Sequence, residues 1–279
     1  MGTISLSIII FTVVFSYQGL RHHPIMHRFA FRVDAVLQRH QYKRLITSGF
    51  LHVSWTHLLL NMISLYAFSG ILETYLGVLP FLLIYFTSLA GGNLFALLVH
   101  RNNGSYSAVG ASGAVSGIIF ASIALFPNLG IGFFGLPFSI PSWFYGIAFV
   151  LYSIYGIRSQ RDNIGHEAHL GGALMGMMTA LLLHPNAFSD NFLIILAISV
   201  PTLVFIYAII TRPHFLLVDN YFFKKRQTQY YSIDHRYNAE KRNRQQEVDA
   251  ILEKIHKKGM KSLTAREREL LSQYSKTVQ

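Results

Sequence analysis

The chain has 279 residues, of which 52% are hydrophobic and only 13% are charged. Soluble proteins carry roughly 25% charged residues, so this composition and the positive mean hydropathy exclude a disordered or an ordinary cytosolic protein. The net charge is +11, and the lack of cysteine excludes disulfide bonds, cysteine-ligated zinc and a thiol nucleophile.

Seven apolar stretches approach the ~20 residues that a helix needs to cross ~30 Å of hydrocarbon. The first is followed by Arg21 rather than by a small-residue cleavage site, so it predicts a span and not a signal peptide. The fourth and sixth are short and rich in Gly, Ala and Ser, which lets helices approach closely and predicts a central position. The predicted fold class is an all-α polytopic membrane helical bundle, with spans at about 4–20, 57–77, 79–99, 112–127, 142–157, 168–184 and 191–211.

The connection between the first two spans, residues 21–56, is unusually long and carries six Lys or Arg and five His. We interpret it as a partly structured loop at the membrane surface. Imidazole suits several transition metals, but a histidine-rich loop that rests among lipid headgroups needs no metal. We therefore expect neither a metal nor a cofactor here, although three histidines lie close together in the sequence, namely His22, His23 and His27.

Beyond residue 211 the sequence becomes polar and basic, with 15 Lys or Arg against 8 Asp or Glu. Apolar residues at helical spacing before Gly259 predict one short helix. The capping-box spacing of Thr264 and Glu267 predicts a second. The predicted organisation is a transmembrane domain over 1–211, a basic linker over 212–245 and a small helical appendage over 246–279.

Polar residues inside membrane spans are energetically costly, so each of them is a candidate for a function. His57 and Asn61 lie one turn apart at the start of the second span. The fourth span opens with Gly110-Ala111-Ser112-Gly113, and the sixth opens near His169. Because successive spans alternate in direction, the starts of the second, fourth and sixth spans face one side of the membrane. We expect these groups to converge.

Each of these signals also has a structural interpretation. The glycines and serines between Gly110 and Gly117 are typical of a small-residue packing face, and Asn61 is typical of a side chain that bonds between helices. Taken alone, His169 is typical of a residue at the membrane surface whose ring bonds a backbone carbonyl. The convergence of a candidate nucleophile, a candidate base and two side-chain donors favours a catalytic site instead.

The chemistry that fits this set is acyl transfer to a serine. A serine hydroxyl becomes a good nucleophile when a neighbouring imidazole takes its proton, so Ser112 is the candidate nucleophile and His169 the candidate base. The oxyanion of the tetrahedral intermediate needs donors worth ~3 kcal/mol each, and His57, Asn61 and the backbone N–H of Ser112 are candidates. Glu167 would point to a different helix face from His169, so we expect a Ser–His dyad.

Four motifs follow one another along this span pattern. They are R-L-I-T-S-G-F-L-H from Arg44, H-x-x-x-N at His57 and Asn61, G-x-S-G at Ser112, and A-H-x-x-G-x-x-x-G from Ala168. In this combination and order they resemble the rhomboid family of intramembrane serine proteases, over about residues 40–180. The resemblance implies a six-helix core, so the seventh span would be an addition at the C-terminal end.

The resemblance also implies roles for individual residues. Ser112 would be the nucleophile, His169 the general base, and His57 with Asn61 the oxyanion donors. Structural support would come from Gly110, Gly113, Gly172, Gly176, Glu73 and Arg44.

Two positions depart from the family pattern. Lys43 stands where the family usually has Trp, which puts the anchoring of that loop in question. In the second span Ser69 replaces the first glycine of G-x-x-x-E-x-x-x-G, and we expect Glu73 to be a structural hydrogen-bonding residue rather than a catalytic one. The tail resembles an accessory module that follows some bacterial rhomboid cores, a likeness that implies no role.

The expected partners are transmembrane protein substrates and membrane lipid. Nucleic acid is not expected, because the charge of the tail is mixed and lacks a recognition motif. The sequence does not indicate the oligomeric state. By resemblance the protein is an integral protein of a bacterial cell (inner) membrane, with an active site that opens away from the cytoplasm.

The distribution of charge predicts the opposite orientation. With seven spans, all 24 Lys and Arg lie on the face that carries Ser112 and His169, which the positive-inside rule makes cytoplasmic. We favour the family orientation, because an interfacial loop can lay its cationic side chains among headgroups.

A second functional hypothesis is a non-catalytic rhomboid-like factor that binds unstable transmembrane helices. The presence of both Ser112 and His169 favours the protease. Ser116, one turn beyond Ser112, is the fallback nucleophile, but it lacks the preceding G-x.

Overall fold

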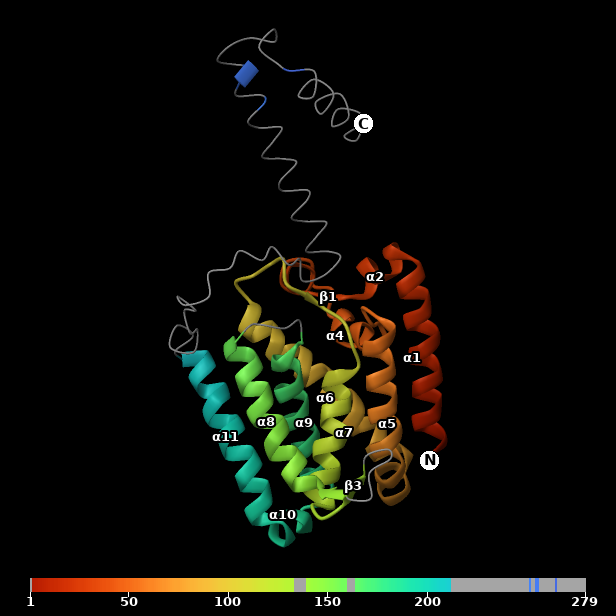
Figure 1. Ribbon diagram of the computed structural model, residues 1–279, viewed down its shortest axis with the longest axis vertical. Coiled ribbons are helices and arrows are strands. Elements are labelled where there is room, and N and C mark those ends of the chain that lie inside the picture. The colour runs from red at the N-terminus through yellow and green to blue at the C-terminus, as the bar shows by residue number, and fades with distance from the viewer. Residues whose placement is uncertain are drawn as a thin grey trace. The chain divides into compact units, whose positions relative to one another are not determined.

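The computed structural model describes residues 2–132, 139–159 and 164–211, together with positions 251, 254, 255 and 264. All seven predicted spans coincide with long helices, which confirms the predicted all-α polytopic membrane bundle (Figure 1). These helices are α1 (Thr3–Arg21), α5 (Trp55–Leu76), α6 (Val78–His100), α7 (Ser112–Leu125), α8 (Ser142–Ser159), α9 (His166–Leu183) and α11 (Phe192–Thr211).

The remaining elements are short and lie in the connections. The connection between α1 and α5 folds into α2 (His23–Phe29), β1 (Phe31–Arg32), α3 (Val33–Leu37), α4 (Arg44–Thr47) and the 3₁₀ turn η1 (Ser48–Phe50). β1 pairs antiparallel with β2 (Ser107–Ala108), in the register Phe31↔Ala108 and Arg32↔Ser107. At the other end of the bundle β3 (Gly130–Gly132) pairs antiparallel with β4 (Ser139–Pro141), and α10 (Asn186–Asp190) precedes α11.

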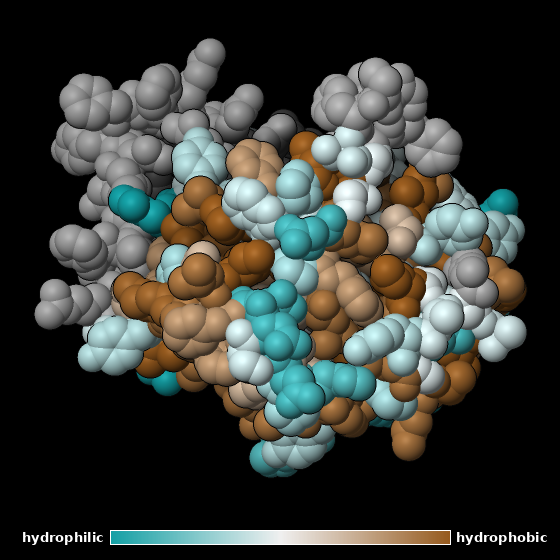
Figure 2. Space-filling view, turned by 90° about the horizontal axis from the view of Figure 1, so that it is seen from below, coloured by the Kyte–Doolittle hydropathy of each residue, from teal (hydrophilic) through white to brown (hydrophobic). Residues whose placement is uncertain are grey.

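Among the described helices, four are long and apolar enough to cross a membrane, namely α1, α5, α6 and α11. The helices α8 and α9 have 18 residues each but are less apolar, and α7 has only 14 residues. Figure 2, seen from below, shows hydrophilic residues across the middle of the end face with hydrophobic side chains on both sides of them. This distribution suits a bundle whose flanks meet lipid.

The short helix α7 occupies the centre of the bundle, as its small residues predicted. Every residue from Gly113 to Ala124 is buried. The helix packs against α9, α6 and α5, while Figure 1 shows α1 and α11 at opposite edges of the bundle. A 14-residue helix fits here because protein rather than lipid surrounds it.

Glycines bring α7 and α9 together backbone to backbone. A Cβ atom added at Gly172 would overlap the carbonyl group of Gly113, and one added at Gly176 would overlap the backbone of Gly117. The packing-face interpretation therefore holds for Gly113 and Gly117, since close backbone approach requires residues without side chains.

Glu73 lies near the end of α5 and caps the start of α1. Its Oε1 accepts a hydrogen bond from the backbone N–H of Ile4 at 3.0 Å, and its Oε2 accepts one from Ser5 at 2.9 Å. The first N–H groups of a helix have no partner within the helix, and a carboxylate is a favourable acceptor for them. The carboxylate thus ties the first long helix to the second.

The seventh long helix, α11, packs against α8. Before it begins, the Asn191 side chain donates a hydrogen bond to the carbonyl of Ala124, near the end of α7, at 2.9 Å. A Cβ atom added at Gly146 of α8 would lie 3.1 Å from Cδ1 of Ile198 in α11. The helix beyond the six-helix core is therefore part of the packed bundle.

The chain divides into two compact units, residues 1–223 and 224–279. The predicted linker over 212–245 lies outside the described residues, as do all but four isolated positions of the predicted appendage over 246–279.

Candidate active site

Ser112 is the first residue of α7, and its side chain is half-buried. It follows Gly110, whose φ of 140° is accessible mainly to glycine. A Cβ atom added at Gly110 would lie 2.8 Å from Cε1 of His57 and 3.7 Å from Oγ of Ser112. The His57 ring and the Ser112 hydroxyl therefore flank the same point, and only glycine leaves it open.

His57 and Asn61 lie one turn apart at the start of α5. The helix begins where Ser54 Oγ accepts a hydrogen bond from the backbone N–H of His57 at 3.2 Å, which is an N-cap. The Asn61 side-chain amide donates to the His57 carbonyl at 2.9 Å. A carboxamide nitrogen carries two hydrogens, so one amide hydrogen of Asn61 is left for a second acceptor.

His169 lies in the first turn of α9, and its side chain is half-buried. Its neighbour in the chain, Ala168, meets the residue that follows the candidate nucleophile, because a Cβ atom added at Gly113 would lie 3.3 Å from the Ala168 carbonyl oxygen. The starts of α7 and α9 are therefore in backbone contact. The rings of Phe149 and His166 lie beside the His169 imidazole, with centroid distances of 5.8 and 5.9 Å.

Glu167 is directed away from this group. Its Oε1 lies 3.3 Å from Nε2 of His100, at the end of α6, and the His100 ring stacks on Tyr106 with centroids 3.7 Å apart. The carboxylate two residues before His169 thus pairs with another histidine. Burial, with the nearby Glu167 carboxylate as a second cause, raises the pKa of Tyr106 above its usual range.

The segment that leads to Ser112 is held by the connection between α1 and α5. The β1–β2 pair fixes residues 107 and 108. The Gly110 N–H donates to the Ser48 carbonyl at 3.0 Å. Asn93 of α6 in turn donates from its amide to the Leu45 carbonyl at 2.7 Å and to Ser48 Oγ at 3.1 Å. The turn before the serine therefore rests on a folded scaffold.

His52 is a residue of this site to which the sequence argument assigned no role. It is fully buried, and its Nε2 accepts a hydrogen bond from the Ala111 N–H at 3.3 Å. Its Nδ1 lies 2.9 Å from Ser16 Oγ, which donates to the Phe50 carbonyl. This pattern requires the proton on Nδ1. Burial, reinforced by the neighbouring His57, lowers the pKa of His52 to about 3, so the ring stays neutral.

A signal for His52 was present in the sequence, since it ends the R-L-I-T-S-G-F-L-H motif. Its partner Ser16, however, lies 36 residues earlier in α1. A contact of this kind follows from packing and not from local spacing.

Two of the residues with expected supporting roles lie away from this cluster. Glu73 is at the opposite end of α5 from His57. Arg44 is buried in the connection, where its Nη1 donates to the carbonyls of His27 at 2.9 Å and Ala30 at 2.7 Å. Burial lowers the pKa of Arg44. Both side chains bond backbone groups of distant segments.

The rhomboid domain profile matches residues 39–186, and a family of unknown function (DUF6576) matches residues 231–277. Rhomboid protein 1, mitochondrial, from Saccharomyces cerevisiae is 33% identical over 137 residues, which cover 48% of this chain and 40% of that protein. RHOMBOID-like protein 12, mitochondrial, from Arabidopsis thaliana is 34% identical over 146 residues, 46% of this chain and 43% of that protein.

Another relative carries a different functional description. Inactive RHOMBOID-like protein 8 from Arabidopsis thaliana is 32% identical over 123 residues, 41% of this chain and 35% of that protein. The chain thus spans less than half the length of these relatives. The rhomboid profile covers more than half of the chain, including the helices from α5 to α9. This chain is an integral membrane protein and belongs to the rhomboid family.

Proposed function

We propose that this protein is an intramembrane serine endopeptidase that uses a Ser–His dyad. Ser112 is the nucleophile, His169 is the general base, and His57 and Asn61 donate hydrogen bonds to the oxyanion. The substrates are membrane proteins that are cut in or near their transmembrane segments.

The observation that carries this proposal is the shared environment of Ser112 and His57 at Gly110. The missing side chain of Gly110 leaves a space bordered by the Ser112 hydroxyl and the His57 imidazole. The Ser112 hydroxyl and the His57 ring nitrogen therefore lie near each other, so His57 can donate to the oxygen of a carbonyl that Ser112 attacks. The backbone contact between Gly113 and Ala168 keeps the helix of the candidate base against the helix of the serine.

In the reaction, His169 accepts the Ser112 proton as Oγ attacks the scissile carbonyl carbon. The negative charge on the carbonyl oxygen receives hydrogen bonds from His57 and Asn61. His169 then gives the proton to the leaving amine, and the peptide C–N bond breaks. Water, deprotonated by His169, hydrolyses the acyl-enzyme and releases Ser112. The bundle must therefore admit water to residues that lie among membrane helices.

The position of the site restricts the substrate. A transmembrane helix hides its carbonyls in hydrogen bonds between residues i and i−4. Segments with Gly, Ala, Ser or Pro unwind more easily near the membrane surface, and these are the proposed cleavage regions. We further propose that the site opens away from the cytoplasm, in a bacterial cell membrane. The relatives come from mitochondria, chloroplasts and a bacterium, so they select no compartment.

Fluorophosphonate labelling in detergent tests the nucleophile. The parent protein should be labelled, and Ser112→Ala should lose labelling and cleavage of a transmembrane substrate to background. Ser116→Ala is the matched control, because Ser116 lies one turn further along α7 and is 3% exposed. Equal labelling of the parent and Ser112→Ala would reject the dyad.

A second function is a non-catalytic factor that binds unstable transmembrane helices, which the similarity to a relative described as inactive favours. Under that function the parent would co-purify with a transmembrane segment rich in Gly and Ser and leave it uncut, and Ser112→Ala would bind it equally. Cleavage by the parent alone separates the two functions.

A further inference from the structure

The mechanism above gives no role to Glu167, although only 12% of its side chain is exposed. An ionisable side chain among membrane helices is costly, so its partner indicates what it does there. Here the partner is His100, the last residue of α6, whose Nε2 lies 3.3 Å from Oε1 of Glu167. The pair therefore joins the end of α6 to the start of α9.

We propose, on the basis of the proposed function, that His100, Tyr106 and Glu167 form a polar cluster that positions the first turn of α9 against the segment leading to Ser112. The three are positioning residues, because they act through the backbone that carries His169 and Ser112.

On one side the cluster fixes the start of α9. Glu167 precedes His169 by two residues, so the two side chains leave the helix in different directions. The contact with His100 holds the Glu167 face of this turn against α6. The two backbones also meet there, because a Cβ atom added at Gly92 of α6 would lie 2.5 Å from the Ala168 carbonyl oxygen. With one face of the turn fixed, the direction in which His169 leaves it is fixed as well.

On the other side the cluster fixes the segment before Ser112. The His100 ring stacks on the Tyr106 ring, with centroids 3.7 Å apart and an interplanar angle of 9°. The Tyr106 ring also meets Phe31 of β1 edge to face at 6.2 Å, and its carbonyl accepts a hydrogen bond from the Val33 N–H at 3.2 Å. Tyr106 stands directly before β2 and six residues before Ser112. His100 thus contacts both the helix of the base and the segment that leads to the nucleophile.

Substitution by leucine separates positioning from stability. His100→Leu leaves the buried carboxylate without its imidazole, which is strongly destabilising, so the thermal midpoint in detergent should fall. Replacing both partners of a buried pair by apolar side chains is often neutral for stability. The double variant of His100→Leu and Glu167→Leu should therefore regain the midpoint of the parent.

The rate of fluorophosphonate labelling should not recover with the midpoint. In the double variant it should stay about tenfold below that of the parent, because the packing of two leucines has no fixed direction and a misplaced base loses rate. The fraction labelled at completion should equal that of the parent, which shows that the molecules are folded. A parent-like rate in the double variant would overturn the inference, since a purely structural pair affects rate and midpoint together.

Hydrogen exchange tests the cluster without any reaction. Glu167→Leu removes the carboxylate and leaves a ring that can stay neutral, so this variant should fold. Peptides that contain residues 105–111 should exchange about fivefold faster than in the parent, although residue 167 lies in another element. Arg101→Gln is the matched control, because Arg101 adjoins His100 in the chain and is exposed; it should exchange and label as the parent does.

The two readouts keep the inference separate from the function on which it rests. Exchange of residues 105–111 at the parent rate in Glu167→Leu would overturn the cluster. Failure of the parent to label at all would instead reject the proposed function, and exchange would still show whether the cluster holds the two segments together.

Discussion

The two ends of α7 are held in place by different means. At the end that begins with Ser112, the preceding turn is bonded through its N–H groups, from Gly110 to Ser48 and from Ala111 to His52. At the other end, carbonyl groups accept from side chains of later helices. The Ser142 Oγ lies 3.0 Å from the Phe126 carbonyl oxygen and 2.8 Å from that of Pro127, and the two carbonyls share its one hydroxyl hydrogen.

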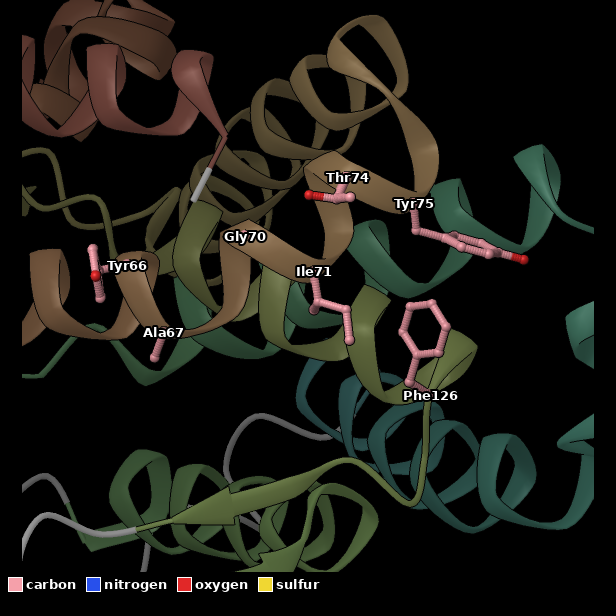
Figure 3. A pocket seen from close by; sticks show the side chains of 7 residues that line it. All are labelled: Tyr66, Ala67, Gly70, Ile71, Thr74, Tyr75 and Phe126. Atoms are coloured by element: carbon pink, nitrogen blue, oxygen red, sulfur yellow. The ribbon is translucent and has the colours of Figure 1, made fainter.

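The far end of α7 also borders a pocket (Figure 3). Its volume is about 750 Å³, and its walls are the second half of α5 and the residue that follows α7. The helix α7 begins at Ser112 and is about 20 Å long, so the pocket at its other end lies far from Ser112. It is lined by Tyr66, Ala67, Gly70, Ile71, Thr74, Tyr75 and Phe126.

The hydrogen bonds at the two ends of α7 have different consequences. Bonds at the Ser112 end fix the backbone beside the proposed nucleophile, whereas bonds at the far end cap a helix as in any folded protein. Substitutions at the Ser112 end should therefore change the rate per folded molecule. Substitutions at the far end should change stability alone.

The largest expected effect is that of Gly172→Ala. The new Cβ atom would overlap the Gly113 carbonyl, and overpacking of this kind costs about 1–3 kcal/mol. Because Gly113 adjoins Ser112, labelling should also slow about a hundredfold. Gly132→Ala, in β3, is the control, as an added Cβ atom there has no neighbour within 4 Å. Thermal unfolding in detergent and labelling kinetics measure both effects, and a parent-like rate in Gly172→Ala would break the contrast.

A pair of polar deletions compares the two ends directly. Asn93→Ala removes two amide hydrogen bonds to the scaffold under Gly110, and Ser142→Ala removes the hydroxyl whose hydrogen two carbonyls share at the far end. Each should lower the free energy of unfolding by about 1–3 kcal/mol. Only Asn93→Ala should reduce kcat for a transmembrane substrate per folded molecule, by about tenfold. Equal kcat values in the two variants would contradict the assignment of the scaffold to the site.

The pKa of His52 predicts a dependence of stability on pH. The pKa of His52 is about 3 in the folded protein, below the ordinary 6.5. Between these two pH values the ring is protonated in the unfolded chain and neutral in the folded chain. Stability from this residue is thus full above pH 6.5 and is lost progressively as pH falls toward 3. His52→Gln should flatten the decline of the thermal midpoint between about pH 7 and pH 5. An unchanged slope would show that other groups cause it.

The smallest expected effect is that of Phe126→Leu in the pocket. The Phe126 ring meets Tyr75 edge to face at 4.9 Å (Figure 3), and an apolar replacement should cost less than about 1.5 kcal/mol. The labelling rate should equal that of the parent, because the change is confined to the far end. A slower rate would mean that the two ends are coupled through α7.

The sequence was sufficient to predict the long helices, since each is a continuous apolar stretch, and the central place of α7, since its small residues signal close packing. It also placed His57, Ser112 and His169 at one end of the bundle by alternation of the spans. It could not predict the Ser16–His52–Ala111 chain, whose members belong to segments that meet only after folding. Nor could spacing show that Phe149 of α8 would lie beside His169.

The backbone contact of α7 with α9 has a consequence for synthesis in the membrane. α7 has 14 residues, a rise of about 21 Å, which is less than the ~30 Å of hydrocarbon. α7 emerges from the ribosome before α9, while the glycine face that covers it is still untranslated. The centre of the bundle is therefore completed late, and until α9 is made the mismatch between α7 and the bilayer must be met by local thinning or by the earlier helices.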